Sequence, residues 1–192
     1  MSSRRLAPVV IVGIVGSLRK ASTNRIVFEA AIDLAGSGLS LVEAPIGEVP
    51  FYDADVEEKG DPPSVTALKQ AVSEGHGVIF FTPEYNGSLP AVVKNALDWL
   101  SRPYGSSAIE TKPVGVVAAT PGRHEVSGVR EQMAAGAAAV KADYFSNSIG
   151  ISSINHRIDD GVLVDVEAQD AVRDWLVEFH GFVVSRHTNR PT

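Results

Sequence analysis

The sequence contains no cysteine. This absence excludes disulfide bonds, zinc sites built on thiolates and thiol nucleophiles. It is typical of proteins that work in a reducing compartment, so we expect a cytoplasmic location. The five histidines are scattered and include no H-x-x-x-H pair, and we therefore expect no metal site.

Long hydrophobic runs and an excess of basic charge are also absent. The apolar run from Val9 to Val15 is interrupted by Gly13 and is far shorter than the roughly 20 residues of a membrane-spanning helix. It also lacks the small-residue cleavage pattern of a signal peptide. The 17 Lys and Arg are outnumbered by 23 Asp and Glu, which gives a formal net charge of −6. We therefore predict neither membrane insertion nor a nucleic-acid partner.

The chain has instead a regular alternation of short β-rich runs and longer helical stretches. Its 192 residues suffice for one well-filled core, so we predict a single domain over 1–192, with flexible ends at 1–7 and 187–192. The predicted strands are Val9–Val15, Leu39–Glu43, Gly77–Thr82, Pro113–Ala119 and Tyr144–Ile151. The predicted helices are Asn24–Ala35, Ser64–Glu74, Leu89–Ser101, Gly128–Ala142 and Ala168–Ser185.

This alternation predicts an α/β fold with three layers. The third and fourth strands are apolar on both faces, which is typical of central parallel strands covered by helices on each side. Five such units with right-handed crossovers predict a flavodoxin-like sandwich, a five-stranded parallel sheet of order 2-1-3-4-5. Ligands in such sheets bind beyond the carboxyl ends of the first and third strands, where the strand order reverses.

The segment after the first strand, from Gly16 to Asn24, is rich in hydroxyl, amide and guanidinium donors. Backbone N–H groups at a helix N-terminus bind anions, and side chains of Ser17, Arg19 and the Ser22-Thr23-Asn24 triplet could complete a phosphate cradle. The same triplet could also serve simply as a helix cap. The segment lacks the Gly-Lys-Ser/Thr ending of a nucleoside triphosphate loop and the G-x-G-x-x-G spacing of dinucleotide folds.

The segment after the third strand, Pro83-Glu84-Tyr85-Asn86-Gly87-Ser88, predicts a turn. Its backbone donors and its one aromatic side chain suit the polar edge and the face of a flat heterocycle. The Asn-Gly pair is common in turns of no special function, so the turn alone is a weak signal. Together with the preceding phosphate loop, it indicates a phosphorylated aromatic cofactor that lies across the ends of two strands.

These segments resemble the NADPH-dependent FMN reductase family, the flavodoxin-like group that includes chromate, quinone and azo-dye reductases. The matching stretches are Gly16–Asn24, Val49–Asp55, Pro83–Pro90 and Lys94–Trp99. The resemblance implies that the cofactor is FMN, with NADPH or NADH as co-substrate. It implies that Ser17, Arg19, Ser22, Thr23 and Asn24 hold the phosphate, and that Pro83, Glu84, Tyr85, Asn86 and Gly87 hold the isoalloxazine, with Thr120 facing the flavin.

The resemblance also implies a ping-pong cycle in which NAD(P)H reduces the flavin and a small acceptor then reoxidises it. The acceptor would be a quinone, free flavin, azo compound or chromate, and no side chain is needed for acid–base catalysis. A homodimer or homotetramer is implied as well. The segment Thr120–Arg130 departs from the family, because it lacks the usual paired glycines; within it, Arg123 and His124 could border the flavin.

Three other functions fit parts of the pattern. A flavodoxin-like electron carrier would use the same fold without oxidising NAD(P)H itself, and a scaffold without flavin would need no cofactor. A response regulator needs acidic residues at the ends of the first and third strands. Gly13–Gly16 contains none, so this third alternative is excluded.

Overall fold

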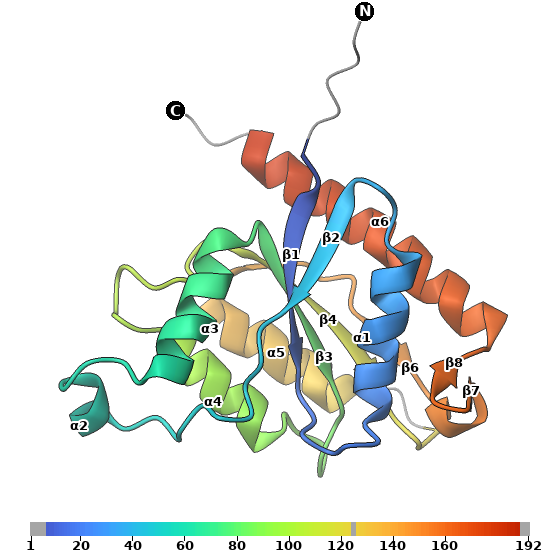
Figure 1. The fold of residues 1–192 in the computed structure, drawn as a ribbon, viewed down its shortest axis with the longest axis horizontal. Helices are drawn as coiled ribbons and strands as arrows, with labels where there is room; N and C mark the ends of the chain where they lie inside the picture. The colour runs from blue at the N-terminus through green and yellow to red at the C-terminus, as the bar shows by residue number, and fades with distance from the viewer. Residues whose placement is uncertain (1–6, 124–125, 189–192) are drawn as a thin grey trace, which may run out of the picture.

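The structure is a computed structural model that describes residues 7–123 and 126–188. Its main sheet contains β1 (Val9–Val15), β2 (Leu39–Glu43), β3 (Gly77–Thr82), β4 (Pro113–Ala119), β5 (Asp143–Tyr144) and β6 (Ile149–Ile151). The parallel strand order is β2-β1-β3-β4-β5, with β6 also paired to β4. The predicted flavodoxin-like order is therefore confirmed (Figure 1).

Helices cover both faces of this sheet. The helices of the described chain are α1 (Thr23–Leu34), the short α2 (Ala54–Glu57), which has no buried residue, α3 (Pro63–Glu74), α4 (Ala91–Leu100), α5 (Ser127–Ala139) and α6 (Val166–Thr188). Helices α1 and α6 pack on one face, and α3, α4 and α5 pack on the other (Figure 1). The core consequently has two apolar clusters, one on each side of the sheet.

Alternation along each central strand explains these two clusters. In β1, Ile11 and Val15 join the α1–α6 side, whereas Val12 and Ile14 join the other side. All six residues of β3 and all seven of β4 are buried, as their apolar sequences predict. A strand that is apolar on both faces is stable only between two helical layers, so the sequence pattern specifies the sandwich.

The predicted fifth strand is wrong in one respect, because it is split into β5 and β6. Phe145 turns toward the α6 side, where its ring lies 5.8 Å from Trp175 and 5.7 Å from Phe179. The Asn147 carbonyl accepts a hydrogen bond from the Trp175 indole. The Phe145 N–H still donates to the Val114 carbonyl, residues 146–148 leave the sheet beside this aromatic cluster, and pairing with β4 resumes at Ile149.

Further differences concern short elements and helix ends. Helix α2, a 3₁₀ turn (Ile154–His156) and the hairpin of β7 (Ile158–Asp159) and β8 (Val162–Leu163) are not among the predicted elements. Helix α5 ends at Ala139 rather than at the predicted Ala142, since Lys141 adopts a positive φ of 56°. Helix α6 continues through Thr188, within the predicted flexible end, and residues 1–6 and 189–192 lie outside the described part of the chain.

No helix in the ranges 7–123 and 126–188 is both long and apolar enough to cross a membrane.

Candidate functional site

The carboxyl ends of β1, β3 and β4 meet at one edge of the sheet, which we call the carboxyl edge. The register pairs Val15 with Phe81 and Thr82 with Ala118. The 16–24 loop after β1 and the 83–88 turn after β3 therefore lie side by side (Figure 1). Ser17 Oγ lies 3.5 Å from the Tyr85 hydroxyl, a contact between the two predicted segments.

Gly16 permits the close approach of these segments. Its N–H donates to the Phe81 carbonyl at 2.8 Å, so the chain is still held against β3 at this residue. A Cβ at Gly16 would lie 2.5 Å from Val93 Cγ2 and 2.7 Å from Thr82 Oγ1. Any larger residue would push the start of the loop away from the sheet.

The 16–24 loop leaves a run of backbone donors open. In the part of the chain that the structure describes, the N–H groups of residues 17–21, Thr23 and Asn24 donate to no protein acceptor. The next two amides are used, because Arg25 N–H donates to Ser22 Oγ and Ile26 N–H to the Ser22 carbonyl. The open donors thus lie around the N-terminus of α1, where the helix dipole adds positive potential. This arrangement suits an anion with several oxygens.

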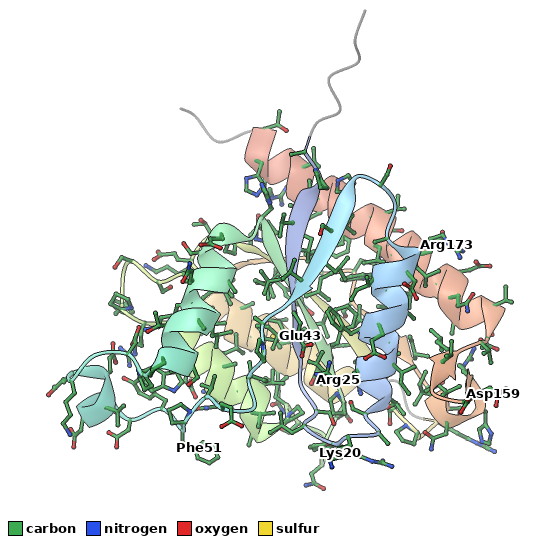
Figure 2. All side chains as sticks on the ribbon, in the orientation of Figure 1. Lys20, Arg25, Glu43, Phe51, Asp159 and Arg173 are labelled. Carbon is green, nitrogen blue, oxygen red and sulfur yellow. The ribbon has the colours of Figure 1, made fainter. Side chains whose placement is uncertain are left out.

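A cavity of about 380 Å³ opens beside this loop, between β2 and α3. Arg19 and Lys20 are exposed on its wall, and among the described residues neither has an ion-pair partner. Arg25 and Glu43 form a two-pronged ion pair across its rim, at 2.6 and 3.0 Å, and Figure 2 shows them pointing toward each other. The hydrogen bonds from Arg25 hold the pKa of the Glu43 carboxyl below its usual value. That pair is internally satisfied, which leaves Arg19 and Lys20 as the available cations.

Ser22 and Asn24 have structural roles that the cradle prediction did not include. Ser22 is the N-cap of α1, because its hydroxyl accepts the Arg25 N–H at 3.2 Å. Asn24 is buried, and its amide makes two 3.0 Å hydrogen bonds to the backbone N–H and carbonyl of Ala119. The Asn24 side chain therefore ties α1 to the end of β4 instead of presenting its amide to the loop.

The 83–88 turn is a tight hairpin. Tyr85 and Ser88 exchange two backbone hydrogen bonds of 3.0 Å, and Asn86 and Gly87 both have positive φ, 53° and 71°. This is the geometry that an Asn-Gly pair favours. Within the described chain, the N–H groups of Glu84, Asn86 and Gly87 have no protein acceptor. Tyr85 is 51% exposed, so the turn offers both donors and an aromatic side chain at the surface.

The remaining predicted residues lie along the same edge. Pro83 is buried directly after β3, while the Glu84 carboxylate accepts the Val129 N–H of α5 at 3.0 Å. Thr120 follows β4, where its N–H donates to the Ile151 carbonyl and its hydroxyl oxygen accepts the Gly122 N–H. Arg123 is exposed, and His124 lies outside the described residues.

Sequence reasoning did not identify how the neighbouring 49–53 loop is held. Asn95 of α4 accepts the Tyr52 N–H at 2.8 Å and donates to the Pro50 carbonyl at 2.9 Å, and the Trp99 indole donates to the same carbonyl. With the loop held by these hydrogen bonds, Phe51 is 76% exposed near the carboxyl edge, and Figure 2 shows its ring at the periphery of the molecule. The spacing of Asn95 and Trp99, one helical turn apart on a half-apolar helix, is the signal that could have indicated it.

The model of the NADPH-dependent FMN reductase family matches residues 9–155. A quinone reductase from Pseudomonas putida is 45% identical over 109 residues, which cover 57% of this chain and 59% of that protein. An NAD(P)H-dependent FMN reductase from Pseudomonas aeruginosa is 38% identical over 115 residues, 60% of this chain and 62% of that protein. The matched segments thus span about three-fifths of the length of these curated relatives.

Among solved structures, FerB from Paracoccus denitrificans, a flavoenzyme NAD(P)H:(acceptor) oxidoreductase, superimposes with a TM-score of 0.83. It is 27% identical, and the superposition covers 92% of this chain and 98% of that one. The similarity therefore extends beyond the matched segment, over almost the whole described fold.

Proposed function

The chain belongs to the NADPH-dependent FMN reductase family, and we propose that it is an FMN-dependent NAD(P)H oxidoreductase. In this proposal electrons pass from NADPH or NADH through bound FMN to a small acceptor. A quinone is our first choice of acceptor, because a quinone reductase is among its similar proteins; free flavin, azo compounds and chromate are the other candidates. The open backbone donors of the 16–24 loop, beside the 83–88 turn, carry the proposal.

The donor set of the 16–24 loop fits a phosphate monoester. The oxygens of such a group, with up to two negative charges, need several short hydrogen bonds at once. The amides of residues 17–21 supply these donors, together with the hydroxyls of Ser17 and Thr23 and the guanidinium of Arg19. In this assignment Ser22 and Asn24 contribute by fixing the start of α1, and the open backbone N–H of Asn24 would be a further donor.

The 83–88 turn fits the polar edge of an isoalloxazine ring. The amides of Glu84, Asn86 and Gly87 are the donors for ring nitrogen and carbonyl oxygen, the exposed Tyr85 supplies apolar surface, and the buried Pro83 fixes the start of the turn. Thr120 directly follows β4, the next strand along this edge, and among the described residues its hydroxyl donates to no protein acceptor. Its hydroxyl is therefore our candidate for a further contact to the flavin.

Bound FMN supplies the hydride and electron chemistry. The protein's part is to bind the phosphate, orient the ring and leave one face of it open to the small substrates. No two titratable side chains of the described site are arranged as a general acid–base pair, so we assign no catalytic side chain. The proposed site residues are accordingly all binding or positioning residues.

We also propose a homo-oligomer, a dimer or tetramer, that works in the cytoplasm as one domain per chain. Exposed apolar side chains beside the site support an oligomer, since Leu18, Phe51 and Tyr85 are 57%, 76% and 51% exposed. Large exposed aromatics are enriched at protein interfaces. Light scattering on a size-exclusion column measures the mass, and a mass of 20.3 kDa, that of one chain, would contradict the proposal.

The function is tested by purification, identification of released flavin, and anaerobic stopped-flow reduction with NADPH and with NADH. We expect the released flavin to be FMN. In the stopped-flow experiment, NADPH or NADH should bleach the absorbance of the bound flavin, and benzoquinone should restore it. A flavin that dithionite reduces but NAD(P)H does not would make the chain an electron carrier. A protein that binds no FMN would contradict the proposal altogether.

A further inference from the structure

Gln132 of α5 directs its whole side-chain amide at the 83–88 turn. Its Oε1 accepts the Ser88 hydroxyl at 2.8 Å and the Leu89 N–H at 3.3 Å, and its Nε2 donates to the Gly87 carbonyl at 3.3 Å. These contacts cross more than forty residues of sequence. Gln132 is exposed, whereas the adjacent Met133 is fully buried and packs in the core. The polar contacts of Gln132 are therefore its main interaction with the rest of the chain.

Glu84 makes the reverse connection, from the turn to α5. The N-cap position of α5, Val126, supplies no side-chain hydrogen bond. The Glu84 carboxylate instead accepts the Val129 N–H at 3.0 Å, and its negative charge stabilises the positive end of the helix dipole. A Cβ at Gly128 would lie 2.3 Å from the Gly87 carbonyl oxygen, so the two backbones touch at this point.

The turn needs such support. It is an isolated two-residue hairpin outside the main sheet, closed by the Tyr85–Ser88 pair, and both of its central residues have positive φ. A hairpin of this size is marginally stable by itself in water. Gln132 and Gly128 contact the carbonyl of the Gly87–Ser88 peptide unit, which directly follows the two units that carry the open N–H groups of Asn86 and Gly87.

We propose that Gln132, together with Glu84, is a positioning residue that fixes the 83–88 turn in its flavin-binding geometry. This inference rests on the proposed function. It couples the flavin ring to α5 through the contacts of Gln132 and Glu84. Because a shifted turn changes the hydrogen bonds to the ring, Gln132 affects both the affinity for FMN and the midpoint potential of the bound flavin.

The test uses Gln132→Met, which preserves the length of the side chain and removes both polar atoms, and Gln132→Glu, which keeps the acceptor and loses the donor to Gly87. Glu131→Gln is the matched control, because Glu131 directly precedes Gln132 on α5, is exposed, and its side chain forms no hydrogen bond in the described chain. Gly128→Ala perturbs the same turn from a second direction.

Three readouts are compared: hydrogen exchange of amides 85–89 in the flavin-free protein, the FMN dissociation constant, and the midpoint potential. For Gln132→Met we expect faster exchange, an FMN dissociation constant raised about three- to tenfold, and a shifted potential, with an unchanged melting temperature. Gln132→Glu should lie between this variant and the wild type, Gly128→Ala should act in the same direction, and Glu131→Gln should match the wild type.

Exchange and affinity that stay at wild-type values in Gln132→Met and Gly128→Ala overturn the positioning role. Altered exchange with an unchanged potential and unchanged FMN affinity also overturns it, since Gln132 would then be structural only. If the wild-type protein itself binds no FMN, the proposed function fails and this role fails with it.

Discussion

The two edges of the sheet treat their backbone donors in opposite ways. At the amino edge, where β1 and β3 begin, the N–H groups of Val9, Val10 and His76 all have acceptors within the chain. At the carboxyl edge, the amides of residues 17–21 and those of Glu84, Asn86 and Gly87 donate to no acceptor in the described chain. The sheet thus has a closed amino edge, where these backbone donors have acceptors in the chain, and an open carboxyl edge, where many backbone donors have none.

The amino edge is closed with side chains as well as backbone. His76 Nδ1 accepts the Val10 N–H at 3.1 Å, and Lys112 donates to the Ser73 carbonyl at 2.8 Å and also to the Gly75 carbonyl. The His187 ring packs edge-on against His76 at 5.0 Å. These contacts satisfy helix ends and strand starts, so they contribute to stability.

The open carboxyl edge differs from the amino edge because its free donors can bind a ligand. Backbone donors that remain without protein acceptors are available to a ligand, and the glycine at position 16 and the positive-φ turn at 86–87 keep them exposed. Substitutions at the amino edge should therefore change the free energy of unfolding, whereas those at the carboxyl edge should change the affinity for FMN.

Asn24 lies at the carboxyl edge, but its substitution should lower the stability of the fold, as substitutions at the amino edge should. Asn24→Ala leaves the buried N–H and carbonyl of Ala119 without partners, so we expect the free energy of unfolding to fall by about 2–4 kcal/mol. Urea denaturation of the flavin-free protein measures it. A loss below about 1 kcal/mol would mean that water replaces the amide and that Asn24 is not part of the closed framework.

Arg19→Ala should show the opposite behaviour. Loss of a charge-assisted contact to phosphate, worth about 1.5–3 kcal/mol, should weaken FMN binding roughly ten- to a hundredfold without changing the free energy of unfolding. Arg173→Ala removes the same charge far from the loop on α6 and serves as the control (Figure 2). Equal FMN affinity in the two variants, measured by fluorescence titration, would remove Arg19 from the phosphate site.

Lys112→Met tests whether a substitution at the amino edge changes stability without changing FMN affinity. The variant keeps most of the aliphatic stem and removes the hydrogen bonds to the Ser73 and Gly75 carbonyls, so we expect a loss of about 1 kcal/mol in unfolding free energy. FMN affinity should remain at the wild-type value. A variant with normal stability and weakened FMN binding would reverse the proposed division between the edges.

The smallest effect concerns the Arg25–Glu43 pair. Hydrogen bonds from Arg25 lower the pKa of Glu43 in the folded state, so the pair contributes stability above the unfolded-state pKa of 4.5. That contribution is lost as the pH falls through the lower folded-state pKa. Glu43→Gln should therefore be less stable than wild type by under about 1 kcal/mol at pH 7, and the gap should close in acid. A gap that widens as the pH is lowered would contradict this assignment.

Most of the framework was predictable because its signal is local. The five apolar runs and the helical spacing between them follow directly from a buried parallel sheet, and five such units with right-handed crossovers favour the flavodoxin-like strand order. The split of the fifth strand was not predictable, because it depends on Phe145 meeting Trp175 and Phe179, which come from a helix some thirty residues later. Local patterns contain no information about such a meeting.

The site divides in the same way. The 16–24 loop and the 83–88 turn follow their strands, so residue type and position sufficed to pair them, and Ser17 and Tyr85 do meet. The roles of individual side chains depend on long-range contacts. Asn24 bonds to Ala119, and Gln132 bonds to the 83–88 turn, each across more than forty residues, which spacing in the sequence cannot indicate.

Amide chemical shifts in titrations with FMN and with riboflavin, which lacks the phosphate, test the open carboxyl edge most directly. We predict that FMN shifts the amides of residues 17–21, Thr23 and Asn24 together with those of Glu84, Asn86 and Gly87, and that riboflavin shifts the second group only. Amides at the amino edge, such as Val10 and His76, should not move with either ligand. Shifts that avoid residues 17–24 with FMN, or that are the same for both ligands there, would contradict the phosphate site.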